Sequence, residues 1–348
     1  MAATPVHSVQ RLSRNVVVLS WVSFFQDAAS EMLYPVLPLF LTGLLGASPA
    51  AVGLIEGVAE ALSSILKGVS GRLADRMARR PLVALGYGLS SVSKGLIAMA
   101  AGWPFVLFCR SLDRVGKGIR TSPRDALIVS NTPLAMRGRA FGFHRAFDTA
   151  GAVVGPLVGL VFYKLLNHRL RPLFALAVIP AVVSTALIGF VRENQQPQRD
   201  RQKQHRAGPL PESFWRVIVF LSIFGLANFS DALIILRMNQ LGMGFVSVML
   251  AYALYNTSYA ALSYPAGVVS DRIPKSLVFA TGLAFFAIAY LGFGLINHSK
   301  WIWPLLLVYG AYTALTMALG KRGLPKQCLP RVPVPRWATS RVFSGSDH

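Results

Sequence analysis

The sequence predicts an all-α membrane protein whose helices cross the bilayer about ten times. Three observations support this. The 348 residues have a mean hydropathy of +0.50 and are 53% hydrophobic, apolar runs recur along the whole chain, and basic residues gather in alternate connections between those runs. The composition excludes a disordered chain and a collagen, and two cysteines, Cys109 and Cys328, are too few for a disulfide scaffold.

Ten apolar runs mark the predicted spans. The first resembles a signal peptide because Arg11 and Arg14 precede it, but it is too long and lacks a small-residue cleavage site. We interpret it as a retained helix. The ten spans lie near residues 16–42, 50–70, 81–101, 104–119, 140–163, 172–191, 215–236, 245–268, 277–297 and 301–319.

The distribution of basic residues predicts the orientation of the chain. With a cytoplasmic N-terminus, 24 of the 35 lysines and arginines fall on the inner side, five on the outer side and six within spans. This asymmetry follows the positive-inside rule and predicts an integral protein of the plasma (inner) membrane. It also accounts for most of the net charge of +21, so no nucleic-acid partner is expected.

A polar linker divides the predicted spans into two groups. Residues 192–214 are basic and polar and follow six spans, so we expect a six-helix half over 1–191, a cytoplasmic linker, and a four-helix half over 215–319. An internal repeat agrees with this division, since GRLADR from Gly71 and GVVSDR from Gly267 follow corresponding spans. Parallel repeats of this kind occur in transporters.

Three motifs carry a resemblance to a known family. Residues 71–80 read GRLADRMARR after the second span, residues 114–118 read RVGKG in the fourth, and residues 151–159 read GAVVGPLVG in the fifth. Together these resemble the loop motif, the R-x-x-Q-G motif and the G-x-x-x-G-P-x-x-G motif of the major facilitator superfamily (MFS), with Ala78 and Lys117 as departures from the pattern.

The resemblance implies an MFS-type helical bundle whose second half is incomplete, with four helices where the family has six. It implies a monomeric secondary transporter that moves a small molecule by alternating access, with proton-coupled export as the expected activity because the glycine motif is typical of exporters that exchange substrate for protons. The alternative is a truncated membrane remnant that transports nothing. No cofactor is expected.

The repeated loops are the predicted conformational latch. An aspartate among arginines at a short loop can form ion pairs in one conformation and lose them in another. The alternative is that the arginines only set the topology. The candidate latch residues are Gly71, Asp75, Arg76, Arg79 and Arg80 in the first loop and Asp271 and Arg272 in the second.

The fifth span carries a predicted packing face. Gly151, Gly155 and Gly159 recur every four residues, which places them on one side of a helix and allows a neighbouring backbone to approach closely. Pro156 removes one backbone hydrogen bond and can bend the helix. Simple packing is one interpretation, and the resemblance implies a second, in which this bend controls ion leak in an antiporter.

Charged residues inside the spans are the candidate coupling and substrate site. Ionisable groups at membrane depth are costly and usually face a cavity or a partner. The acids of the first two spans and the charges of the fourth are spaced by three, four or seven residues, so the charged residues of each span lie on one face of their helix. We therefore expect carboxylates to face guanidinium groups across a polar cavity. The alternative is permanent ion pairing. The candidates are Asp27 and Asp113, followed by Glu31, Glu56, Glu60, Arg110, Arg114 and Lys117.

Enzyme signatures are missing from the sequence. We find no Cys/His metal spacing, no phosphate-binding glycine loop and no catalytic triad that can be placed. Residues 320–348 contain four prolines and six basic residues but no span. We expect a frameshift or truncation near residue 316, the alternative being a natural ten-span chain with a basic tail against anionic lipid.

Overall fold

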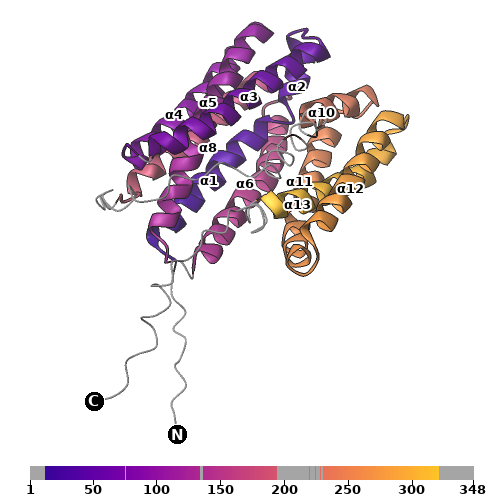
Figure 1. The fold of residues 1–348 in the computed structure, drawn as a ribbon. Coiled ribbons are helices and arrows are strands. Elements are labelled where there is room, and N and C mark those ends of the chain that lie inside the picture. The colour runs from indigo at the N-terminus through magenta and orange to yellow at the C-terminus, as the bar shows by residue number, and fades with distance from the viewer. Residues whose placement is uncertain are drawn as a thin grey trace, which may run out of the picture. The chain divides into compact units, whose positions relative to one another are not determined.

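The computed structural model describes residues 12–74, 76–133, 136–193 and 230–320, together with the single positions 219, 224 and 228. All regular elements in these ranges are helices (Figure 1). Six of them are long and apolar enough to cross a membrane; they span Arg14–Leu44, Pro49–Ala74, Arg137–Leu165, Leu170–Phe190, Phe245–Ser270 and Leu277–Leu295.

The first predicted span is a helix with an interrupted end. Helix α1 (Arg14–Leu33) begins at Ser13, whose hydroxyl accepts a hydrogen bond from the Val16 N–H. It ends before Pro35, and a short helix α2 (Leu37–Leu39) and a π-helical turn η1 (Phe40–Leu44) follow. The span is thus interrupted between Tyr34 and Val36, and Pro35 and Pro38 explain this because neither donates a backbone hydrogen bond.

The next spans are long helices joined by short connections. They are α3 (Pro49–Ala74), α4 (Arg79–Ala98), α5 (Trp103–Ser130) and α6 (Arg137–Leu165), and the sixth span is built from α7 (Leu170–Leu176), α8 (Val178–Leu187) and the turn η3 (Ile188–Phe190). Helix α5 runs well past the predicted end at residue 119. Its polar second half stays helical because Arg120 is buried, donating to the Ser90 hydroxyl at 2.7 Å and covering the Tyr87 ring.

The remaining described helices are α10 (Asp231–Gln240), α11 (Phe245–Arg272), α12 (Lys275–Leu295) and α13 (Ile302–Gly320), with a 3₁₀ turn η5 (Ser299–Trp301) before the last. The seventh predicted span lies largely outside the described residues, and only its end is seen, in α10. The other nine predicted spans coincide with helices within a few residues at most ends.

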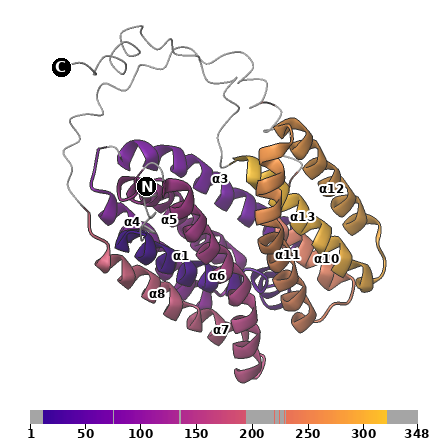
Figure 2. The same cartoon turned by 90° about the horizontal axis from the view of Figure 1, so that it is seen from below.

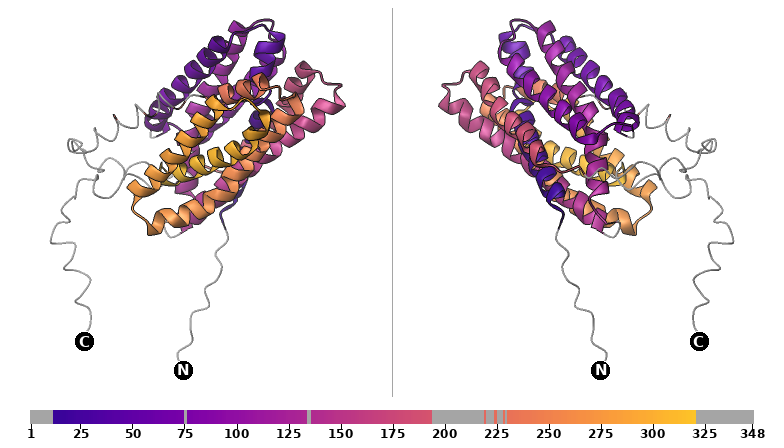
Figure 3. Two further views of the ribbon diagram at one scale, coloured as in Figure 1. Left: turned by 90° about the vertical axis from the view of Figure 1, so that its right-hand side faces the viewer. Right: turned by 90° about the vertical axis from the view of Figure 1, so that its left-hand side faces the viewer.

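Helix packing brings the polar faces together. Helix α1 packs along α6 and α8, while α3 and α4 both pack on α5 (Figure 1). Helix α11 packs along α6, and α10 contacts α2 and α3, which can be followed in Figure 2 and in the two views of Figure 3. The charged stripe of α5 therefore faces α3 and α4, and α1 has α6 as its neighbour.

Two hydrophobic cores lie at opposite ends of these helices. The first, at what we call the Tyr34 end, joins Met32, Phe40 and Phe174 to Leu236 of α10 and Met249 of α11. The second, at the Arg14 end, contains residues such as Leu19, Tyr87 and Ile128, and its described members all come from the segment before residue 192. Helices α10 and α11 thus share a core with the earlier helices at the Tyr34 end.

Candidate functional site

A buried bidentate ion pair joins α3 to α5. The Arg110 guanidinium donates to both oxygens of the Glu56 carboxylate, with Nε to Oε1 at 2.9 Å and Nη2 to Oε1 and Oε2 at 2.7 and 2.9 Å. Less than a tenth of either side chain is exposed. The two planar groups match each other, which is the strong form of such a pair.

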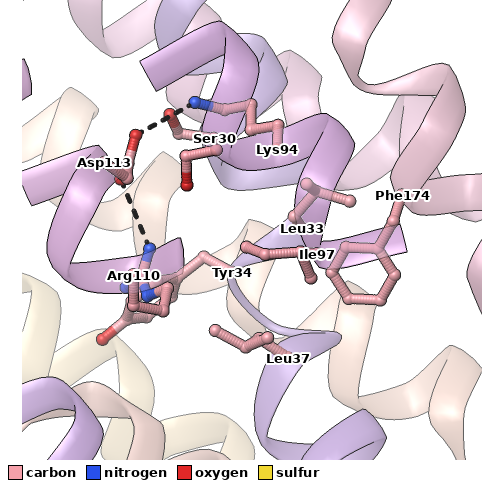
Figure 4. Close-up of a pocket in the computed structure, with 10 residues that line it drawn as sticks. Ser30, Leu33, Tyr34, Leu37, Lys94, Ile97, Arg110, Asp113 and Phe174 are labelled. Atoms are coloured by element: carbon pink, nitrogen blue, oxygen red, sulfur yellow. Dashed lines mark hydrogen bonds and ion pairs between the residues drawn. The ribbon is translucent and has the colours of Figure 1, made fainter. Parts of the chain in front are cut away.

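Asp113 lies in the same network but takes its partners from two helices. Its carboxylate is 3.3 Å from the Lys94 ammonium of α4 and 3.5 Å from Nη1 of Arg110 (Figure 4). These groups line a small cavity that also contains Ser30 and Tyr34. Its volume of about 20 Å³ is enough for one water molecule but not for an organic substrate. The sequence identified Lys94 only as a charge within a span and missed its role as the partner of Asp113.

The rest of the α5 stripe is paired less closely. Arg114 lies 3.8 Å from Glu56 and 3.9 Å from Glu60, and its Nε is buried without a hydrogen-bond partner among the described residues. Lys117 interacts electrostatically with Glu60 and Asp27 but forms no ion pair within 4.0 Å in the described part of the chain. Glu60 is half-exposed and pairs with Lys67 at 3.8 Å. Carboxylates of α3 and guanidinium groups of α5 thus face each other.

The acids of α1 have a different environment. The Tyr252 hydroxyl of α11 donates to Oε2 of Glu31 at 2.7 Å. Asp27 faces Asp148 of α6, and the two carboxyl groups interact electrostatically. Neither Asp27 nor Glu31 forms an ion pair with a described residue, in contrast to Glu56 and Asp113.

A second polar cluster surrounds Asp148 and was only partly expected. Arg145 pairs with Asp148 at 3.4 Å, and Nε2 of His144 lies 3.3 Å from the Ser23 hydroxyl, which also accepts a hydrogen bond from Arg124 at 3.2 Å. His144 lies at the inner start of the fifth predicted span, where the sequence suggests a solvated or latch-associated role. The solvated role is wrong, because His144 is buried and its ring faces Ser23 of α1.

Tyrosines connect the later helices to the site. The Tyr34 hydroxyl lies 3.0 Å from that of Ser230, and the Tyr309 hydroxyl of α13 donates to Oδ1 of Asp231 at 2.5 Å. The rings of Tyr34 and Tyr252 are 5.6 Å apart. The sequence placed Asp231 among the acids within spans, but no spacing singled out the tyrosines, since their partners are distant in the chain.

The glycine face of α6 lies directly on the backbone of α1. A Cβ added at Gly151 would stand 2.5 Å from the Phe24 carbonyl oxygen, and one at Gly155 would stand 2.6 Å from that of Ala28. One at Gly159 would meet the Met32 side chain at 2.7 Å. The glycines thus lie where α6 approaches α1 most closely. Helix α6 continues through Pro156 without a break.

The described residues contain no group of three or more His, Cys, Asp or Glu side chains that could hold a metal ion. The site is thus a set of buried charges and tyrosines, gathered from α1, α3, α4, α5, α6, α10, α11 and α13, within helices long enough to cross a membrane.

Comparison with known proteins identifies the family. The model of the Major Facilitator Superfamily matches residues 19–321. The chain belongs to this superfamily. An uncharacterized MFS-type transporter of Methanocaldococcus jannaschii is 35% identical over 315 residues, which cover 88% of this chain and 78% of that one. The multidrug resistance protein MdtG of Escherichia coli is 26% identical, over 78% of this chain and 70% of its own length.

Solved MFS structures share the fold. A bacterial homolog of the human lysosomal transporter Spinster has a TM-score of 0.65 at 16% identity, covering 87% of this chain and 72% of that one. A POT family transporter in complex with 5-aminolevulinic acid has a TM-score of 0.61 at 12% identity, covering 88% and 82%. The chain is therefore an integral membrane transporter of small molecules, and not an enzyme.

The MFS loop motif is seen only in part. Asp75 lies outside the described residues, and so do the side chains of Asp271 and Arg272, whose backbones end α11. A Cβ added at Gly71 would be in ordinary contact with Ser122, and Arg76 is exposed. The proposed latch contact between the two loops therefore stays a prediction.

Glu193 holds the start of α4 and was missed by sequence reasoning. Its carboxylate accepts hydrogen bonds from the backbone N–H groups of Arg79 and Arg80, at 2.8 and 3.1 Å. The Arg80 guanidinium donates to the Gly189 carbonyl at 2.8 Å. A carboxylate at a helix N-terminus is favourable, but here it comes from the end of the sixth span, so local sequence did not predict it.

Proposed function

We propose that this MFS transporter exports a small molecule across the plasma membrane in exchange for protons, by alternating access, as a monomer with a cytoplasmic N-terminus. The two groups of helices, before residue 192 and after residue 214, would rock against each other around the charged site. Its relatives named multidrug resistance proteins support export, and the basic inner connections support the orientation.

The observation that supports alternating access is the packing of the later helices at the Tyr34 end. There α10 and α11 share a hydrophobic core with the first six spans. With the N-terminus in the cytoplasm, the Tyr34 end is extracellular. The described state would thus be closed to the outside. Rocking of the two groups of helices would open the Tyr34 end and close the Arg14 end.

The acids without ion pairs are the best candidates for proton carriers. Glu56 and Asp113 are engaged in buried ion pairs, so they act mainly as structural partners of Arg110 and Lys94. Asp27 and Glu31 have no such partner within 4.0 Å among the described residues and are partly accessible. They support proton exchange, with Asp27 and its neighbour Asp148 as the first choice.

These roles predict different results for two substitutions. Asp27→Asn is expected to leave expression and thermal stability near the wild-type values while reducing proton-linked transport at least about tenfold, because the amide cannot carry the proton. Asp113→Asn is expected to lower stability, because it leaves Lys94 without its buried partner. The measurement uses inside-out vesicles in which a respiratory pH gradient is monitored with acridine orange while a panel of neutral, cationic and anionic drugs is added.

The control is Asp125→Asn, since Asp125 is half-exposed and pairs with the adjacent Arg124. It should transport like the wild type. If a folded Asp27→Asn protein still collapses the pH gradient at the wild-type rate, the assignment of Asp27 is wrong. If none of the compounds in the panel causes the folded wild-type protein to collapse the pH gradient, proton-coupled export loses its support.

A further inference from the structure

Two carboxylates of the site form no ion pair with a described residue and lie among tyrosine rings, and the charges of Lys117, Arg114 and Arg110 act on Glu31 only from longer range. Glu31 of α1 and Asp231 of α10 each accept a hydrogen bond from a tyrosine, and neither has a lysine, arginine or histidine within 4.0 Å among the described residues. Every described acid of α3 and α5 has such a partner. The two acids without ion pairs therefore form a distinct part of the charged site.

The hydrogen bonds leave both carboxylates able to bind something else. Tyr252 occupies only Oε2 of Glu31, and Tyr309 occupies only Oδ1 of Asp231, so one oxygen of each group keeps its acceptor sites. Both acids are partly accessible, whereas the two tyrosines that hold them are buried. The buried tyrosines hold one oxygen of each acid in place.

Aromatic rings run continuously between the two acids. The Tyr34 and Tyr252 rings are 5.6 Å apart, Tyr252 and Tyr255 are 5.8 Å apart, and Tyr255 stacks on Tyr309 at 5.1 Å. The faces of such rings attract cations, and Arg110 already lies over the Tyr34 ring at 5.7 Å. An aromatic wall with carboxylates at both ends suits a positively charged group attached to an apolar body.

A buried amide on the same wall also lacks a partner. Asn256 follows Tyr252 by one turn of α11, so the two share a helix face. It is only 6% exposed, and its Nδ2 has no hydrogen-bond partner among the described residues. A buried polar group left without a partner indicates a water or a ligand, and an asparagine can present either its oxygen or its nitrogen to that ligand.

We propose that Glu31, Asp231 and the rings of Tyr34, Tyr252, Tyr255 and Tyr309 form the substrate site of this transporter, and that its substrates are aromatic or otherwise lipophilic organic cations. The proposal rests on the export function above and deepens it. A carboxylate that binds the cation cannot at the same time hold a proton, so occupancy by one displaces the other. Substrate binding then displaces a proton at this site, in addition to any proton carried by Asp27.

The test measures binding directly, without transport. Purified protein in detergent is titrated calorimetrically with tetraphenylphosphonium, and separately with tetraphenylborate, which has nearly the same size and shape and the opposite charge. We expect the cation to bind and the anion not to bind. Glu31→Gln and Asp231→Asn should each weaken cation binding at least about tenfold, since each removes a charge at short range from the ligand.

Further variants distinguish the contribution of the Tyr252 ring to cation affinity from that of its hydroxyl. Tyr252→Phe keeps the ring and should retain most of the affinity, whereas Tyr252→Leu removes the ring and should lose several-fold. Asp125→Asn, outside the site, should bind like the wild type. Binding should also release protons, detected with a pH indicator in weak buffer, and folding of each variant is checked by its melting temperature.

Several results would overturn the proposal. One is unchanged cation affinity in folded Glu31→Gln and Asp231→Asn. Another is no cation binding to folded wild-type protein. A third is binding of tetraphenylborate that weakens in Lys117→Gln, which would assign an anion site to Arg114 and Lys117 instead. If the cation binds as expected but no pH gradient drives its movement in vesicles, the site stands and the proton-coupled export proposal fails.

Discussion

Replacing Glu56 with alanine is expected to lower the free energy of unfolding by about 3–5 kcal/mol, the usual cost of leaving one member of a buried ion pair without its partner. Arg110 would keep its charge, because a guanidinium does not lose its proton in a protein. It would then face Arg114 with only Asp113 to compensate. Expression and the melting temperature in detergent should both fall clearly.

The chain provides its own reporter for this measurement. Cys109 is fully buried, so a thiol-reactive dye labels it only when the protein unfolds, once Cys328 has been replaced by serine. The matched control is Glu60→Ala, one turn further along α3. Glu60 is half-exposed and its ion pairs are 3.8 and 3.9 Å long, so the loss should stay below about 1 kcal/mol. Equal losses in the two variants would contradict the structural role of Glu56.

A double variant tests the structural role of the Glu56–Arg110 ion pair in a second way. Replacing Glu56 and Arg110 together by leucine removes both charges, so no unpaired charge is left on this pair. We expect the double variant to be more stable than Glu56→Ala alone, even though it changes more atoms. Transport should still be lost, because Arg110 also holds Asp113 and covers Tyr34.

Replacing Gly155 with alanine is expected to destabilise the protein by about 1–3 kcal/mol, the usual cost of adding atoms to a packed interface. The new methyl group would stand 2.6 Å from the Ala28 carbonyl oxygen and 3.0 Å from the Met32 nitrogen. Because these are backbone atoms, no rotamer change relieves the contact, and α1 and α6 must separate. Asp27 and Asp148 would then move apart, so transport should fall as well.

Gly142→Ala in the same helix is the matched control, because nothing lies within 4 Å of its added methyl group. Alanine is the better helix former, so this variant should be as stable as the wild type or slightly more so. The comparison uses the same dye-based melting experiment. A stability for Gly155→Ala equal to that of Gly142→Ala would show that α1 and α6 do not pack as described.

Much of the fold could be predicted from the sequence because the membrane imposes simple rules. Apolar runs located the spans, basic connections gave an orientation, and glycines spaced by four predicted the face on which α1 and α6 meet. The charged stripe from Arg110 to Lys117 was predicted for the same reason, since helical spacing alone decides which side chains share a face.

The partners across helices could not be predicted in this way. Lys94 meets Asp113 from a different helix, Tyr252 meets Glu31 across 221 positions of the chain, and Glu193 reaches the start of α4 from the end of the sixth span. Periodicity shows which face of a helix is polar but not which helix stands opposite. The burial of His144 was missed for the same reason, because it depends on how α6 lies on α1.

The most direct test of alternating access is a reversible cross-link at the Tyr34 end. The rings of Tyr163 on α6 and Phe245 on α11 stack with their centres 3.8 Å apart. Cysteines at both positions, in a background without Cys109 and Cys328, can be joined by a short bis-methanethiosulfonate reagent. The single-cysteine variants serve as controls. We predict that the cross-link stops transport and that reduction restores it, whereas full transport by the cross-linked protein would contradict the proposal.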